Sequence, residues 1–248
     1  MGILRTKTIE PATGSTLTLG ASGDTITVSS DSIKTNTFKD AGGNTLFTSD
    51  GAGTLSSVNS GIAGNAGPVL LSTSTGSGVS SMSITSGIDS TYDEYMFVIT
   101  DQNPVSFAYI FGFQVSIDGG SNYNVACTST FFMARQKEDG SGAALSYDTD
   151  GDQAQGTGYQ ELASNVHNDA DAGCAGILHL FNPTSTTYTK NFYSRFLSYQ
   201  NDNPGTHDGG PQDCFGAGYF NTTSAVTAIR FQMNNGNFDG VIQMYGIK

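Results

Sequence analysis

The residue composition changes near residue 80, and this change limits what the chain can fold into more than any single motif does. Up to Gly78 the chain is rich in Ser, Thr and Gly and contains only two aromatic residues, Phe38 and Phe47, whereas aromatic residues are frequent from Tyr92 to Tyr245. Isolated pairs of short strands bury too little surface to be stable in water. The sequence therefore predicts a first part built to attach or assemble, followed by a self-sufficient folded head.

The composition also predicts an all-β protein. The chain contains 32 glycines, and each glycine inside a helix costs about 1 kcal/mol relative to alanine. Runs of Thr, Ser, Val, Phe and Tyr are broken by Gly, Asn and Asp, which is typical of short strands joined by turns. We therefore divide the chain into an N-terminal β-repeat arm (residues 1–60), a Gly/Ser-rich connector (61–82) and a β-sandwich head (83–248).

The first part contains a loose repeat in which apolar and hydroxyl residues alternate. Residues 14–19 and 23–28 share this pattern nine positions apart, and residues 43–48 and 54–58 continue it. Alternation makes one face of each short strand apolar, and stacked units or other copies of the chain must cover that face. We expect the arm to serve docking and oligomerisation through an assembly interface made of Leu17, Leu19, Ile26 and Val28.

The head has its clearest strand pattern at residues 105–117, where every odd position is Val, Phe, Tyr or Ile. This period of two predicts one strand that faces a core and bends at Gly112. Residues 118–122 predict a hairpin turn into a second strand at 123–127. Further strands are predicted at 95–100, 130–135, 176–181, 191–199, 216–220, 225–233 and 241–247. This number of strands favours a two-sheet sandwich, with a jelly roll as the preferred topology.

The charge and the cysteines exclude several classes of function. A formal net charge of −12 disfavours nucleic acid as a partner, because binding to phosphates needs a basic surface. The three cysteines, Cys127, Cys174 and Cys214, form neither a disulfide framework nor a metal-binding pair by their spacing. The N-terminus has no apolar run long enough for a signal peptide or a membrane span. We expect synthesis in a cytoplasm, no membrane insertion and no cofactor.

Three segments resemble proteins of tailed bacteriophages. The repeats, with Gly23-Asp24-Thr25-Ile26-Thr27-Val28, resemble repeats of fibre and virion appendage proteins. Residues 225–248, which end in Tyr245-Gly246-Ile247-Lys248, are similar to the terminal hairpin of phage structural proteins, and residues 116–123 are in keeping with the same group. The resemblance implies a virion component, commonly trimeric, whose slender N-terminal part docks on the particle while a β-rich head faces outward. It implies no active residues.

One acidic run is a candidate metal site. Asp148, Asp150 and Asp152 alternate as the carboxylates of a calcium loop can. The run departs from the EF-hand pattern, because its glycine is at the fourth position and Tyr159 is at the twelfth. We therefore expect a solvated acidic loop and assign no metal.

No catalytic motif is present, and we expect no enzyme activity. The adjacent carboxylates of residues 93–94 and 138–139 point to opposite faces of a strand, so they do not form the pair that cleaves glycans. The loop residues Tyr147, Tyr159 and Tyr188 are candidate contacts for a host-surface glycan, or else buried anchors of their loops.

The sequence thus predicts a non-enzymatic structural component of a phage particle, a tail fibre or spike-like appendage that assembles as a homotrimer with other virion proteins and contacts the host surface. One alternative is a capsid decoration or head-fibre protein. An alternative of another class is a carbohydrate-binding module.

Overall fold

The structure is a computed structural model that describes residues 35–52, 55–59, 67–106, 110–200 and 209–248. The described residues form strands, turns and bends with no helix, so the prediction of an all-β protein is confirmed. The chain divides into two compact units, residues 1–63 and 64–248. No helix in the described ranges is long and apolar enough to cross a membrane.

The first unit contains a three-stranded antiparallel sheet. Its strands are β1 (Thr37–Lys39), β2 (Thr45–Ser49) and β3 (Leu55–Val58), paired in the order β1-β2-β3. The rings of Phe38 and Phe47 stack across β1 and β2 with centroids 4.4 Å apart. The two predicted repeat units at 43–48 and 54–58 therefore correspond to β2 and β3. The assembly residues Leu17, Leu19, Ile26 and Val28 lie outside the described residues.

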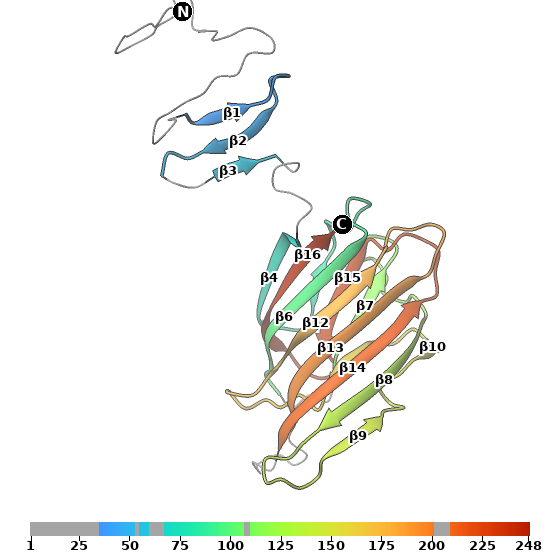
Figure 1. The fold of residues 1–248 in the computed structure, drawn as a ribbon. Helices are drawn as coiled ribbons and strands as arrows, with labels where there is room; N and C mark the ends of the chain where they lie inside the picture. The colour runs from blue at the N-terminus through green and yellow to red at the C-terminus, as the bar shows by residue number, and fades with distance from the viewer. Residues whose placement is uncertain (1–34, 53–54, 60–66, 107–109, 201–208) are drawn as a thin grey trace, which may run out of the picture. The chain divides into compact units, whose positions relative to one another are not determined.

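The second unit contains two antiparallel sheets, a large one of nine strands and a small one of four. The large sheet has the order β10-β8-β14-β13-β12-β6-β16-β4, with β9 also paired to β8, and Figure 1 shows most of these strands side by side from β4 to β9. Its strands are β4 (Val69–Val79), β6 (Glu94–Pro104), β8 (Cys127–Arg135), β9 (Ala144–Tyr147), β10 (Ala154–Gly156), β12 (Cys174–Phe181), β13 (Lys190–Gln200), β14 (Gly210–Phe220) and β16 (Phe238–Ile247). The small sheet has the order β11-β7-β15-β5, with strands β5 (Met82–Ile84), β7 (Ile110–Ser116), β11 (Gln160–Ser164) and β15 (Ala228–Met233).

The core lies between these two sheets, and aromatic rings from both meet in it. Phe97 of β6 packs on Phe231 of β15 with ring centroids 5.6 Å apart. Phe113 of β7 meets Phe192 of β13 edge to face at 5.2 Å. All four rings are buried, and tilted or edge-to-face contacts are the geometry that aromatic quadrupoles favour. The alternation along each strand thus places one face in this sandwich-like core and leaves the other face of the large sheet outside.

The predicted strand at 105–117 is corrected by the structure. Within the described residues the strand β7 covers Ile110–Ser116, residues 107–109 of the prediction lie outside the described part, and Val105 and Ser106 form a bend in which Val105 is 60 % exposed. The bend follows β6, because the chain must leave the large sheet there to enter the small one. Gly112 also meets a steric requirement, since a Cβ on it would lie 2.7 Å from the carbonyl oxygen of Gln160 in β11.

Two further predictions are corrected. The turn at 118–122 forms, and Asp118 Oδ1 accepts the backbone N–H of Asn122 at 2.9 Å. It makes no hairpin, because of the predicted second strand at 123–127 only Cys127 belongs to a strand, and that strand, β8, lies in the other sheet from β7. Part of the predicted connector is the edge strand β4 of the large sheet. Its backbone hydrogen bonds to β16 hold it there, and such bonds leave no apolar pattern in the sequence. The strands predicted at 95–100, 130–135, 176–181, 191–199, 216–220, 225–233 and 241–247 match β6, β8, β12, β13, β14, β15 and β16.

Candidate functional site

The outer face of the large sheet carries a row of large side chains that we call the outer row. Strand register places its members directly opposite one another across β12, β13, β14, β8 and β9. They are Ile177, Arg195, Phe215, Phe132 and Tyr147. Ile177, Phe132 and Tyr147 are 38, 40 and 53 % exposed, and neighbouring exposed apolar side chains of this kind are a feature of interaction surfaces.

Two rings of the outer row are stacked on each other. Phe132 and Phe215 lie on neighbouring strands with ring centroids 4.8 Å apart and planes only 6° from parallel. This distance equals the spacing between strands, about 4.8 Å, so the rings are stacked face to face. Arg195 covers Phe215 on its other side, with Cζ 5.0 Å from the ring centroid. Both faces of the Phe215 ring are therefore covered, and one face of the Phe132 ring is covered by Phe215.

A second group of rings lies on the same face, on β12 and β13. His179 and Tyr193 stack with centroids 4.5 Å apart and planes 18° from parallel, and Phe181 lies 5.6 Å from Tyr193. His179 Nδ1 also contacts the Glu94 carboxylate from β6. As the alternation predicts, His179 shares a strand face with Ile177 and Phe181, and it is held by its neighbours there.

A shallow hollow of about 370 Å³ lies beside the outer row. It is lined by Ala175, Gly176, Ile177, Arg195, Leu197 and Asp213. Leu197 is 54 % exposed, and Asp213 holds the Arg195 guanidinium through Nε and Nη2 at 3.1 and 2.7 Å. The hollow thus combines an open apolar side chain with an ion pair that keeps Arg195 over the ring of Phe215.

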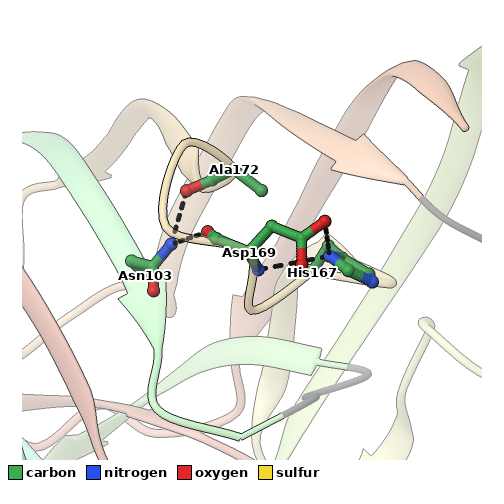
Figure 2. A network of polar contacts seen from close by, with 4 residues as sticks. All are labelled: Asn103, His167, Asp169 and Ala172. Carbon is green, nitrogen blue, oxygen red and sulfur yellow. Dashed lines mark hydrogen bonds and ion pairs between the residues drawn. The ribbon is translucent and has the colours of Figure 1, made fainter. Parts of the chain in front are cut away.

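The apolar surface ends at an acidic border. A second hollow of about 340 Å³ shares Leu197 with the first and includes Asp101 and Asp171, and a third contains Glu138 and Asp169. The loop before β12 is fixed by the contacts in Figure 2, where Asn103 Nδ2 donates to the carbonyl oxygens of Asp169 and Ala172. Next to this pair, the backbone N–H of Asp169 donates to His167 Nδ1 at 3.2 Å. These bonds fix the loop that carries two of the border carboxylates, Asp169 and Asp171.

The three candidate glycan tyrosines are not brought together. Tyr147 is 53 % exposed at the end of the outer row, and its hydroxyl donates to Asp152 Oδ2 at 2.5 Å. Tyr159 precedes β11 of the small sheet, where it flanks Arg230 at 5.5 Å. Tyr188 is 68 % exposed in the connection from β12 to β13. Each stays a candidate contact on its own, but they do not form one site.

Two carboxylates of the acidic run accept hydrogen bonds from residues close to them in the sequence. Asp148 Oδ1 accepts the backbone N–H of Asp150 at 2.9 Å, and Asp152 accepts Tyr147. Across the described ranges, no group of three His, Cys, Asp or Glu side chains is placed to hold a metal ion.

Beside this run, Glu161 of β11 is buried between the sheets. Burial raises the pKa of Glu161 to about 8, a hydrogen bond with Ser164 opposes this, and the charges of Asp148 and Asp150 add to it. The carboxyl is therefore protonated at neutral pH. Its Oε1 has no hydrogen-bond partner in the part of the chain that the structure describes. Burial likewise raises the pKa of the Cys127, Cys174 and Cys214 thiols, which keeps them in the unreactive protonated form.

Sequence reasoning missed the outer row, although one signal for it was present. Phe131 and Phe132 are adjacent in β8, and neighbours in a strand point to opposite faces, so one of the two rings had to leave the core. The partner of Phe132 could not be found in this way, because Phe215 lies far along the chain and only register brings the two together.

Comparison with known proteins gives no family for this chain: no family model, no curated protein and no solved structure matches it.

Proposed function

We propose that this chain is a non-enzymatic structural component of a bacteriophage particle, a tail fibre or spike-like appendage that assembles as a homo-oligomer. The observation that carries the proposal is the exposed outer row with its stacked rings and the open Leu197 beside it. A surface of this kind acts by contact with another surface. The division of the chain into a repeat-containing unit and a larger unit with its own core suits an arm that docks and a jelly-roll-like head that is presented.

The composition of the surface supports a protein partner. Aromatic side chains and arginine are enriched at the centres of protein interfaces, whereas charged carboxylates are found at the rim. The outer row provides Phe132, Phe215 and Arg195, and the border with Asp101 and Asp171 lies at its edge. Other virion proteins and further copies of this chain are partners of this chemistry.

The alternative from another class, a carbohydrate-binding module, has less support. A sugar ring stacks on the open face of an aromatic ring, whose negative charge attracts its C–H bonds. In the outer row Phe215 has no open face, because Phe132 covers one side of its ring and Arg195 covers the other. A host glycan remains a contact for the three candidate tyrosines, each taken separately. The capsid decoration or head-fibre alternative uses the same surface at a different place on the particle.

Incorporation into particles tests the role of the outer row. We expect the double substitution Phe132→Ser/Phe215→Ser to lower the amount of this chain in purified particles at least about tenfold, because removing two central aromatic residues from an interface typically costs more than 1.4 kcal/mol. Thr130→Ser is the matched control on the same face of β8, and it should leave incorporation unchanged. Normal incorporation of the double variant would remove the outer row from the assembly.

Light scattering on the purified chain tests the homo-oligomer. We expect a number of chains that is a multiple of three. A monomer at all concentrations would refute the assembly that the proposal requires.

A further inference from the structure

The strand β4 forms one edge of the large sheet, and this edge differs from all the others in the second unit. In the described part of that unit β4 is hydrogen-bonded only to β16, while its other side carries no strand (Figure 1). It is 11 residues long, whereas the other edge strands, β5, β9, β10 and β11, have 3, 4, 3 and 5 residues. Proteins keep exposed edges short because a long edge is a template for pairing with another strand.

The side chains of β4 also lack the usual protection. Exposed edges are normally guarded by charged residues, by proline or by bulges. The strand reads Val-Leu-Leu-Ser-Thr-Ser-Thr-Gly-Ser-Gly-Val and contains neither a charged residue nor proline. The register with β16 shifts only near its two ends, so residues 72–76 are regular extended backbone. Thr73 and Thr75 are exposed on the outer face, opposite Gln243 and Val241 of β16.

The charge of the chain indicates which partner fits this edge. With a net charge of −12, two copies repel each other wherever acidic surfaces meet, and an edge without charge is a place where they can approach. In the regular part of β4, reversing the strand about Ser74 brings Thr73 opposite Thr75 and Ser72 opposite Gly76, and Thr–Thr pairs stabilise antiparallel strands.

We propose that β4 of one copy pairs antiparallel with β4 of a second copy about a two-fold axis near Ser74, which joins the two large sheets into one continuous sheet. A two-fold contact of this kind uses the same residues on both copies and closes at two. This inference goes beyond the proposed function, because it names the surface that joins two heads and does not depend on a phage particle.

Paired charge substitutions in the full-length chain test this contact. In the double variant Thr73→Lys/Thr75→Lys, each introduced lysine lies opposite a lysine of the other copy, and like charges directly opposite destabilise a strand pair. We expect light scattering to give half as many chains per particle as the wild type. The variant Thr73→Glu/Thr75→Glu should behave in the same way, and an equimolar mixture of the two should restore the wild-type number. Thr223→Lys, at an exposed position in the connection between β14 and β15, is the control and should leave the number unchanged.

A third variant separates loss of pairing from loss of folding. Thr73→Lys/Thr75→Glu places opposite charges across the two-fold axis, so it should keep the wild-type number of chains. Equal numbers in the wild type and both like-charge variants would overturn the proposal, and so would a mixture that fails to restore the wild-type number. The twofold drop in the number of chains tests the β4 contact alone. The homotrimer is tested separately, by whether the like-charge variants contain three chains or one.

Discussion

The stability of this protein should depend on pH through the buried carboxyl of Glu161. The pKa of Glu161 is raised to about 8 in the folded protein, against 4.5 for an exposed glutamate. Between these values the unfolded chain releases a proton that the folded protein keeps. The folded state thus binds more protons, and its stability falls as the pH rises through this window. The stabilisation is complete below pH 4.5 and is lost by about pH 8.

The size of this effect follows from the two pKa values. Each pKa unit corresponds to about 1.4 kcal/mol, so the whole difference is worth about 5 kcal/mol. The part that falls between pH 5 and pH 8 is about 3 kcal/mol, because the unfolded carboxyl is already mostly ionised at pH 5. That is a large fraction of the 5–15 kcal/mol by which domains are usually stable.

Urea unfolding at several pH values measures the effect through Glu161→Gln, which keeps the shape of the side chain and cannot ionise. We expect the free energy of unfolding of the wild type to fall by about 3 kcal/mol relative to this variant between pH 5 and pH 8. The exposed Glu138 supplies the control Glu138→Gln, which should follow the wild type at every pH. Parallel curves for the wild type and Glu161→Gln would refute the reasoning.

Three further predictions concern stability and thiol reactivity. Lys190→Met should lower the free energy of unfolding by about 3 kcal/mol in urea unfolding, because the buried Nζ donates to the carbonyl oxygens of residues 185, 188 and 222; a loss below about 0.5 kcal/mol would contradict this. Gly112→Ala should lower the free energy of unfolding by about 2 kcal/mol in the same assay, since its Cβ would lie 2.7 Å from a backbone oxygen. An unchanged free energy of unfolding would contradict this, because it would mean that β11 moves away without cost. Thiol-specific labelling should be slow in the native protein and fast in urea, because burial raises the pKa of all three thiols; fast native labelling would contradict their burial. These thiols are Cys127, Cys174 and Cys214.

The strands that sequence reasoning predicted correctly are those whose own residues carry the pattern. In β13, Phe192 and Phe196 are buried while the residues that follow them, Tyr193 and Leu197, are exposed, and this alternation is visible in the sequence alone. The period of two arises from local backbone geometry, so no knowledge of neighbouring strands is needed.

The features that escaped prediction depend on pairing between distant residues. The stack of Phe132 on Phe215 exists only because β8 and β14 pair in one register, and a shift by one residue would move one ring to the other face. All five residues of β11 are buried, Glu161 included. An alternating pattern would place Glu161 on an exposed face, so the sequence gives no sign that this side chain is buried. For the same reason the sequence of β4 predicts a connector. Backbone hydrogen bonds to β16 hold this strand in the sheet, and its own side chains carry no strand pattern.

We propose above all that this chain is part of a phage particle. Immunogold electron microscopy tests this most directly, on particles purified from the host that makes the chain. With antibodies against residues 64–248, we expect gold on the particle surface, confined to the tail for a fibre or spread over the capsid for a decoration protein. Labelling no higher than on particles from a strain that lacks the chain, together with its absence among the proteins of the purified particle, would contradict the account.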